Sequence, residues 1–208
     1  MAAGAGAGVL RDAGLWAAGD EYDFDAQDWW FRVRFAAAPV APGERVALRV
    51  DGVATVHEVF LNGEPLPGGD SMFEWHETEV ADHLIEQNEL AIRCRALRPL
   101  VGVSRKPRAR WRQQVVDGNL RWFRTMLLGR APGFAPGPAA VGPWRPVALV
   151  RFRARIMSLD LRTSLRGDDG VLSSLLTLDG DPGPLTLEVT GPTGPQRAAL
   201  PTTASVVE

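Results

Sequence analysis

The strongest constraint on the fold lies between residues 45 and 95, where apolar and polar side chains alternate over short stretches. Val46, Leu48 and Val50 follow the two-residue period of a half-buried β-strand. Similar short runs recur along this part of the chain, each bounded by glycine or proline. Short runs of this kind predict strands rather than helices, because a helix of a globular protein needs a longer periodic stretch. The chain is therefore expected to be all-β.

Glycine-containing pairs set the expected connections between these strands. Asp51-Gly52 and Asn62-Gly63 favour hairpin turns, since glycine adopts positive φ without a steric clash. Pro65, Pro67, Gly68 and Gly69 predict a surface loop. The expected strands of this part are residues 46–50, 53–61, 72–80 and 89–96. Antiparallel strands joined by tight turns predict a β-sandwich or jelly roll.

Two further strands are expected on either side of this centre. Residues 28–35 carry Trp29, Phe31, Val33 and Phe35 on one face, which favours a core strand, and residues 146–153 predict a closing strand. Residues 97–145 are punctuated by proline, and only residues 120–128 look strand-like. A long irregular excursion inside a compact domain is typical of a binding or interface loop.

Several phrases resemble the N-terminal sugar-binding (galactose-binding-like) jelly roll of glycoside hydrolase family 2, with the β-mannosidase branch as the best match. The phrases are DGVATVHEVFLNG, MFEWH, NELAIRC and GPWRPVAL, with Asp28-Trp29-Trp30 ahead of them. The resemblance covers roughly residues 14–154. It implies a jelly-roll domain that accompanies a separate catalytic barrel.

The pattern divides the chain into three expected parts. Residues 1–13 are rich in alanine and glycine and are expected to be poorly ordered, since small side chains bury little surface. Residues 14–154 are expected to form the jelly roll. Residues 155–208 hold three strand-like stretches, MSLDLRTSL, GVLSSLLTL and PLTLEVTG, which resemble the opening of an immunoglobulin-like sandwich. Such a sandwich needs about seven strands, so a partial one is expected here.

Composition excludes several classes of protein. A formal net charge of −2 argues against whole-chain attraction to nucleic acid or to an anionic membrane. No run approaches the ~20 apolar residues of a membrane-spanning helix. The N-terminus lacks the basic and apolar regions of a secretory signal, so a cytoplasmic location is expected. The single cysteine, Cys94, forms no internal disulfide, and its place in an alternating strand favours a buried, unreactive thiol.

Neither a catalytic site nor a cofactor is expected in this chain. His57, His76 and His83 show no metal-ligand spacing. Asn88-Glu89 is similar to the Asn-Glu pair that carries the acid/base in family 2 barrels, but it lies at a turn without a partner carboxylate. The resemblance implies that both catalytic carboxylates belong to the barrel. The chain alone is therefore expected to be inactive.

A cluster of basic residues is the most distinctive feature outside the strands. Residues 93–130 contain eleven Arg or Lys and one acid, Asp117, interleaved with tryptophan and phenylalanine. This composition suits an interface with a neighbouring acidic domain, contact with a sugar, or binding of single-stranded nucleic acid. The interface is favoured over the sugar, and nucleic acid is the least favoured of the three.

The resemblance narrows the candidate residues. In β-mannosidases a Phe-x-Trp-Asp-Trp-Gly-Pro segment of this region helps to hold the terminal sugar beside the barrel. Here the region reads RWFRTMLLGRAPGFAPGPAAVGPWRP, without the Trp-Asp-Trp. The candidates for sugar or interface contact are therefore Arg121, Trp122, Arg124 and Arg130.

These observations lead to one expected function and two alternatives. The chain is expected to be the non-catalytic, sugar-binding N-terminal region of a β-mannosidase-like glycoside hydrolase, and a fragment that lacks the catalytic barrel. Its expected partners are a β-linked sugar or oligosaccharide and a glycosidase barrel encoded downstream. A stand-alone carbohydrate-binding or interaction module is the first alternative. Nucleic-acid binding through the Arg/Trp loop is the weaker one.

Overall fold

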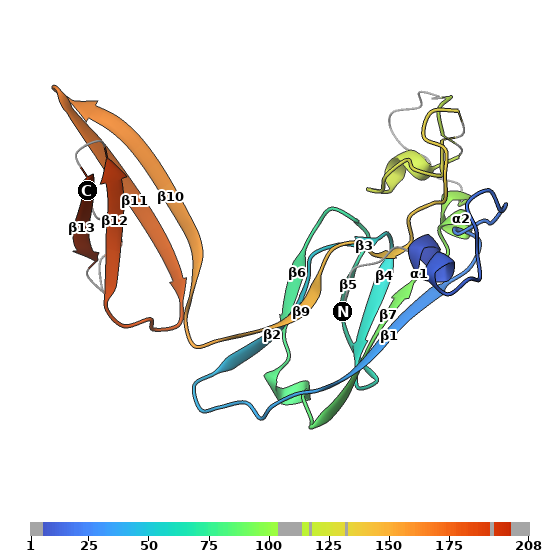
Figure 1. Cartoon of the computed structure of the whole chain (residues 1–208), viewed down its shortest axis with the longest axis horizontal. Helices are drawn as coiled ribbons and strands as arrows, with labels where there is room; N and C mark the ends of the chain where they lie inside the picture. Colours follow the sequence, from blue (N-terminus) through green and yellow to red (C-terminus); the bar gives the residue numbers. More distant parts are fainter. Residues whose placement is uncertain (1–5, 104–113, 117, 132, 192–193, 201–208) are drawn as a thin grey trace. The chain divides into compact units, whose positions relative to one another are not determined.

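The fold is described from a computed structural model, which describes residues 6–103, 114–116, 118–131, 133–191 and 194–200 (Figure 1). The chain divides into two compact units. The first joins Met1–Ala41 to Val46–Val150, and the second joins Pro42–Arg45 to Arg151–Glu208. Strands dominate both units, so the expectation of an all-β chain is confirmed.

Four antiparallel strands form the larger sheet of the first unit, in the order β1-β7-β4-β5. Their bounds are Trp29–Ala36 for β1, His57–Leu61 for β4, Glu64–Gly69 for β5 and Gln87–Cys94 for β7. The two faces of β1 alternate between half-buried and exposed as the sequence predicts, with Trp29 and Phe31 inward and Arg32 and Arg34 in solvent. β7 pairs with both β1 and β4, and therefore lies inside the sheet.

A second sheet has the order β6-β2-β9, and two short strands, β3 and β8, pair beside it. Their bounds are Arg45–Val50 for β2, Val53–Ala54 for β3, His76–Glu79 for β6, Gly142–Pro143 for β8 and Val147–Phe152 for β9. Both sheets contribute to one buried core that includes Val46, Leu48, Val50, Val59, Leu61, Leu90, Ile92 and Val147. Burying each such side chain contributes roughly 1.5–3 kcal/mol relative to leaving it in water. The first unit is thus a two-layer β-sandwich.

One of the two expected hairpin turns is confirmed and the other is wrong. Asn62 (φ 54°) and Gly63 (φ 86°) both lie in the left-handed region and join β4 to β5, as a tight hairpin of this kind requires. Asp51-Gly52 does not make a hairpin, because β2 pairs with β6 and β9, whereas β3 pairs with β8. Asp51 and Gly52 instead connect β2, which belongs to one sheet, to β3, which pairs in another.

Two other local expectations are corrected. Glu64–Gly69 is strand β5 rather than a loop, and it lies at the edge of its sheet, where proline is tolerated because the edge needs fewer ladder hydrogen bonds. The expected strand at residues 120–128 begins instead with the 3₁₀ helix η2, Leu120–Trp122, and continues as a loop. In the irregular region, Leu97–Val101 forms helix α2.

Residues 1–13 were expected to be poorly ordered, but within them helix α1 spans Gly6–Asp12. Ala7 is buried in the sandwich core, and the Gly6 N–H donates to the Val141 carbonyl at 2.7 Å. The small residues of this stretch permit close approach to the sandwich, which composition alone did not reveal. Residues 1–5 lie outside the described residues.

The second unit contains two antiparallel hairpins. β10, Arg155–Arg166, pairs with β11, Asp169–Asp179, and β12, Leu185–Gly191, pairs with β13, Gly194–Leu200. Three strands were expected, and β13 was missed because its small and polar residues carry little β-propensity. Leu159, Leu161 and Leu165 of β10 are all exposed. Whether this unit belongs to an immunoglobulin-like sandwich stays a prediction.

Candidate functional site

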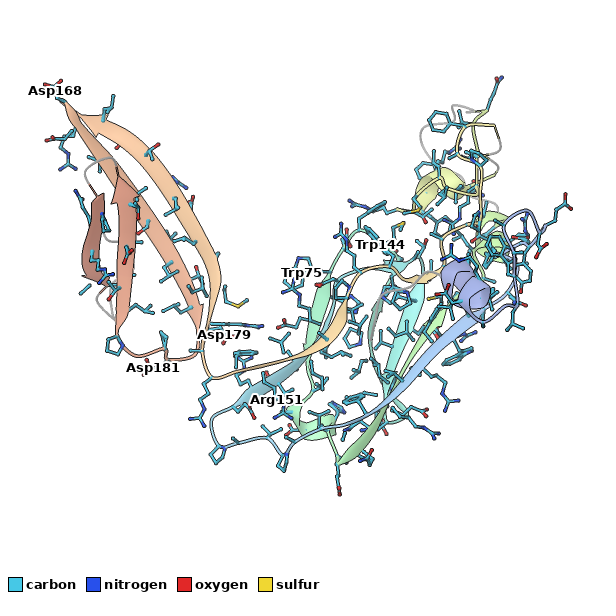
Figure 2. All side chains as sticks on the ribbon, in the orientation of Figure 1. Trp75, Trp144, Arg151, Asp168, Asp179 and Asp181 are labelled. Atoms are coloured by element: carbon cyan, nitrogen blue, oxygen red, sulfur yellow. The ribbon has the colours of Figure 1, made fainter. Side chains whose placement is uncertain are left out.

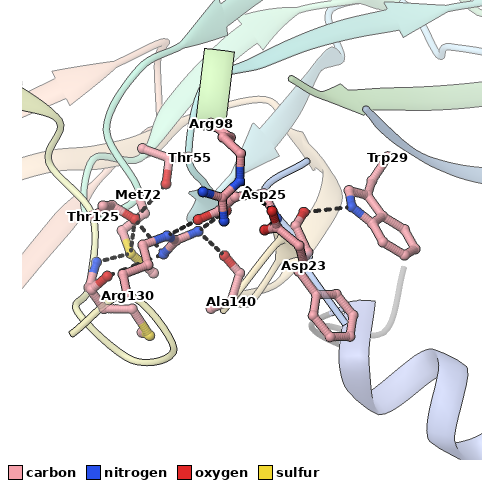
Figure 3. A network of polar contacts seen from close by, with 11 residues as sticks. Asp23, Asp25, Trp29, Thr55, Met72, Arg98, Thr125, Arg130 and Ala140 are labelled. Carbon is pink, nitrogen blue, oxygen red and sulfur yellow. Dashed lines mark hydrogen bonds and ion pairs between the residues drawn. The ribbon is translucent and has the colours of Figure 1, made fainter. Parts of the chain in front are cut away.

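Arg130, one of the four candidates from the sequence, lies inside the first unit. Its side chain is 4% exposed, and that of its ion-pair partner Asp25 is 13% exposed. The Arg130 Nε and Nη2 atoms donate to the two Asp25 carboxylate oxygens, each at 2.7 Å. Further hydrogen bonds reach Thr125 Oγ1 at 3.1 Å and the carbonyls of Met126 at 3.2 Å and Ala140 at 3.0 Å (Figure 3). All five guanidinium N–H groups are therefore used within the chain.

This network makes Arg130 a structural residue. It joins Asp25, which lies 105 positions away in the sequence, to Thr125 and Ala140, which lie near Arg130 in the sequence. Removing one partner of a buried ion pair leaves an uncompensated charge, which costs about 3–5 kcal/mol. With all five N–H groups engaged within the chain, Arg130 holds the loop in place. Its role in sugar or interface contact stays a prediction.

A second ion pair lies next to the first, between Asp23 and Arg98. The Arg98 Nε donates to Asp23 Oδ2, and the backbone N–H of Arg98 donates to the Asp25 carbonyl at 3.0 Å. The hydrogen bond from Arg98 holds the pKa of Asp23 below its usual value, against the smaller opposing effect of burial. Both residues are more exposed than Arg130 and Asp25. Asp23 and Arg98 therefore present an ionised, accessible pair.

These two pairs line a cleft of about 390 Å³ in the first unit. Its walls include Asp23, Asp25, Arg98, Leu120, Gly129 and Arg130. A neighbouring hollow of about 710 Å³ shares Asp23, Arg98 and Gly129 and adds Trp16, Tyr22 and Phe24. Gly129 (φ +72°) could not be replaced without strain, since a Cβ there would lie 2.2 Å from the Ala139 nitrogen. Charged hydrogen-bonding groups and aromatic rings thus line one continuous concave surface.

The loop that follows η2 is anchored to the sandwich. The Met126 N–H donates to the Met72 sulfur at 3.0 Å, and Thr125 Oγ1 lies 2.5 Å from Thr55 Oγ1 (Figure 3). The Met72 N–H also donates to the Arg124 carbonyl at 2.9 Å. These contacts fix the position of the loop, so its exposed side chains are presented from a defined backbone.

The structure separates the remaining three candidates from Arg130. Arg121 lies over the Trp122 ring, with its guanidinium carbon 5.2 Å from the ring centroid. Arg124 pairs with Glu74 at 3.3 Å, and both side chains are largely exposed. Trp122 and Arg124 are exposed and Arg121 is half-buried, whereas Arg130 is buried.

Several arginines of the basic cluster are neutralised within the chain. Arg93 pairs with Asp28 at 2.6 Å and with Glu58 at 3.1 Å. Arg98, Arg124 and Arg130 also have carboxylate partners. Residues 105–112, the most basic stretch of the cluster, lie outside the described residues. The described part of the cluster thus offers less positive charge than its sequence suggests.

The pKa values of Asp23, Asp28 and Glu89 are lowered, whereas a general acid requires a raised pKa. Hydrogen bonds from Arg32 and Arg34 lower the pKa of Glu89, and the Ala96 N–H, followed by Arg93, lowers that of Asp28. Glu89 accepts from Arg32 at 2.7 Å on the solvent face of β7. Asn88 is buried and accepts from the Ile85 N–H at 2.9 Å. The Asn88-Glu89 pair is therefore engaged in sheet contacts.

The histidines form a stack that the sequence did not predict. The His57 and His76 rings lie 5.3 Å apart with an interplanar angle of 22°, and connect β4 to β6. The Nε2 atom of each ring is buried without a hydrogen-bond partner. Desolvation lowers the pKa of both. Over the described ranges, no group of three or more His, Cys, Asp or Glu could hold a metal ion.

Two further expectations can be compared with the structure. Cys94 is buried, as expected, and burial raises the pKa of its thiol to about 12. In the described part of the chain, no helix has the length and apolar character needed to cross a membrane.

Asp23, Asp25 and Arg98 were not predicted from the sequence as members of a site. A signal was present, because the acidic stretch EYDFDAQD precedes β1 and complements the basic cluster far along the chain. The pairing itself joins Asp25 to Arg130 across 105 positions. Local patterns do not specify which acid meets which base over such a distance.

Comparison with known families finds a match over residues 8–145 to the family described as "Glycosyl hydrolase 2 galactose-binding domain-like". Two fungal proteins named beta-mannosidase B are similar to this region. The protein of Thermothelomyces thermophilus is 33% identical over 138 residues, which cover 65% of this chain and 16% of that protein. The protein of Aspergillus terreus is 27% identical over 149 residues, covering 68% and 17% respectively. The chain thus matches about one sixth of the length of these relatives.

Solved structures show the same fold. A β-D-mannosidase from Dictyoglomus thermophilum superposes with a TM-score of 0.69 at 22% identity, over 98% of this chain and 27% of the other. A β-glycosidase from Bacteroides vulgatus gives a TM-score of 0.53 at 16% identity, over 84% and 20%. At such low identity these likenesses concern the fold alone.

Proposed function

The chain belongs to the galactose-binding-like domain family of glycoside hydrolase family 2, and on this premise we propose that it is the non-catalytic sugar-recognition region of a β-mannosidase-like glycoside hydrolase. The observation that carries the proposal is the family match over residues 8–145, which spans nearly the whole sandwich. The catalytic carboxylates would lie in a barrel domain beyond the residues of this chain. A β-linked sugar would be the ligand.

The cleft beside Asp23 supports recognition rather than chemistry. Ionised Asp23 and Arg98 are hydrogen-bonding partners for sugar hydroxyls, and Arg98 offers planar, directional donors. Trp16 and Tyr22 are among the residues that line the adjoining hollow. Apolar walls with a few oriented polar groups are the usual composition of a small-ligand site. We therefore assign the sugar contact to this cleft.

Among the described residues of the basic cluster, which do not include 105–112, the ion pairs favour a sugar over nucleic acid. Arg93, Arg98 and Arg124 are each matched by a carboxylate. Phosphate binding depends on unneutralised Lys and Arg, because its free energy comes largely from counterion release. An interface with the barrel remains compatible with the same surface. A cytoplasmic location stays a prediction from the sequence.

The proposal is tested by ligand-observed NMR with methyl β-D-mannopyranoside and the full chain. The variant Asp23→Asn should weaken binding about tenfold or more, since hydrogen bonds to charged groups contribute roughly 1.5–3 kcal/mol. Glu89→Gln is the matched control, because Glu89 is also an ion-paired carboxylate but lies on the outer face of β7. Absence of sugar binding to the unmodified chain would refute the proposal. Equal loss in both variants would refute the assignment to the cleft.

A further inference from the structure

A cluster of aromatic side chains is exposed on the first unit, away from the cleft. Phe73 is 47% exposed and Trp75 is 60% exposed, and Trp144 is half-buried. The Phe73 ring meets the Trp144 ring edge-on, with centroids 6.2 Å apart. Figure 2 labels both tryptophans. None of the three lines the cleft or its neighbouring hollow. Large aromatic rings left together in water indicate a binding surface.

The cluster is held in a fixed geometry. The Trp144 Nε1–H donates to the Met72 carbonyl at 2.8 Å, and its backbone N–H donates to the Gly52 carbonyl at 3.2 Å. A Cβ on Gly52 would lie 2.8 Å from Trp144 Nε1, so only glycine permits this approach. The Phe73 N–H donates to Ser71 Oγ at 3.3 Å. A ligand would therefore meet a preorganised surface, which lowers the entropic cost of binding.

Charged pairs surround the rings. Arg49 lies over Trp75 at 5.4 Å from the ring centroid and also pairs with Asp51 at 2.6 Å. Glu74 pairs with Arg124 at 3.3 Å, with both side chains exposed. Exposed pairs of this kind contribute little to stability. They can therefore exchange their mutual hydrogen bonds for those of a hydroxyl-rich ligand at little cost.

The near balance of charge favours a neutral ligand. Around the rings, the cations of Arg49 and Arg124 are paired with the carboxylates of Asp51 and Glu74, and Arg145, whose guanidinium carbon lies 4.2 Å from the centroid of the Trp144 ring, adds one further cation. A polyanion would need excess positive charge, and an obligate protein partner favours a depletion of charge at the centre of its interface. Aromatic faces interleaved with bidentate donors and acceptors instead match the apolar face and the hydroxyls of a pyranose.

We propose that Phe73, Trp75 and Trp144, with the pairs Arg49–Asp51 and Glu74–Arg124, form an aromatic platform that binds a neutral β-linked oligosaccharide. The platform is a second contact surface, separate from the cleft around Asp23. It rests on the proposed sugar-recognition function, because the class of ligand is taken from there. It adds affinity for chains longer than one sugar unit.

The test compares the affinities of the full chain for β-1,4-mannotriose and for methyl β-D-mannopyranoside, by calorimetry. Trp75→Ala should weaken mannotriose binding at least about fivefold, as truncation of a central aromatic contact costs more than about 1 kcal/mol. Binding of the monosaccharide should be unchanged. Trp30→Ala is the matched control, because Trp30 is 54% exposed and also lies under an arginine, Arg93, but belongs to the outer face of β1. Arg124→Gln is a second variant should Trp75→Ala fail to fold.

The outcomes separate the platform from the proposed function. Loss of the mannotriose advantage in Trp75→Ala and Arg124→Gln, but not in Trp30→Ala, supports the platform. Unchanged mannotriose binding in both platform variants, with binding still sensitive to Asp23→Asn, overturns the platform and leaves the proposed function standing. If no sugar binds, the proposed function itself fails. Self-association of the protein that Trp75→Ala abolishes, without any effect on mannotriose, identifies a protein interface instead and also overturns the platform.

Discussion

Replacing Arg130 with methionine should destabilise the first unit more than any exposed arginine substitution. The variant keeps the side-chain volume but removes the cation from Asp25, whose side chain is only 13% exposed. It also leaves the carbonyls of Met126 and Ala140 without their Arg130 donor. Breaking a buried pair from one side costs about 3–5 kcal/mol. We therefore expect the free energy of unfolding to fall by about that amount.

Urea unfolding followed by tryptophan fluorescence is a suitable assay. All seven tryptophans lie between residues 16 and 144, within the first unit, so the signal does not report on the second. Arg34→Met is the matched control, because Arg34 is paired with Glu89 but its side chain is 81% exposed. The control should unfold at nearly the same urea concentration as the unmodified protein.

A double variant, Asp25→Asn with Arg130→Met, gives an independent check. It leaves no unpaired charge in the cluster, so its destabilisation should be smaller than the sum of the two single variants. A free energy of unfolding of Arg130→Met that lies within about 1 kcal/mol of that of the unmodified protein would refute the structural role of Arg130. In that case the residue would return to consideration as a ligand contact.

Three further predictions concern other parts of the chain. Burial lowers the pKa of His57 and His76 below the ordinary 6.5, so the folded state binds fewer protons than the unfolded state. The free energy of unfolding should therefore be highest above pH 6.5 and fall as the pH drops below it. Thermal unfolding measured against pH should show this fall, and the fall should be shallower in His57→Gln. Cys94, with a pKa of about 12 and a buried side chain, should react with a thiol reagent only after unfolding, and rapid labelling of the native protein would contradict this. The exposed apolar face of β10 should make the second unit less stable than the sandwich. Limited proteolysis should therefore cut first within residues 153–166. Equal hydrogen-exchange protection of both units in a monomer would contradict this lower stability.

The sequence predicted those elements whose partners are determined by local chemistry. The alternation in β1 gave its inward face, and Asn62-Gly63 specified a hairpin because both residues must adopt positive φ. Asp51-Gly52 carries a similar signal, but the chain there passes between ladders, and only tertiary pairing decides that. The prolines of β5 led to the wrong prediction of a loop. A strand tolerates proline when it lies at the edge of a sheet, and the local sequence does not show where in the sheet a strand lies.

The candidate site was predicted in part. The basic, aromatic loop was recognisable from composition, and two of its named residues, Trp122 and Arg124, are exposed. Arg130 was indistinguishable from them in sequence, because its burial depends on Asp25, 105 positions away. The platform around Trp75 was also not predicted, since Trp144 lies far along the chain from Phe73 and only the fold brings these two rings together.

We propose that this chain recognises a sugar without performing chemistry on it. The most direct test is a calorimetric titration of the full chain with methyl β-D-mannopyranoside and with a single-stranded oligonucleotide, at about 50 and about 200 mM salt. We expect the mannoside to bind with an affinity that salt leaves unchanged, because a neutral ligand releases no counterions. Oligonucleotide binding that weakens steeply with salt, with no binding of the mannoside, would contradict the claim.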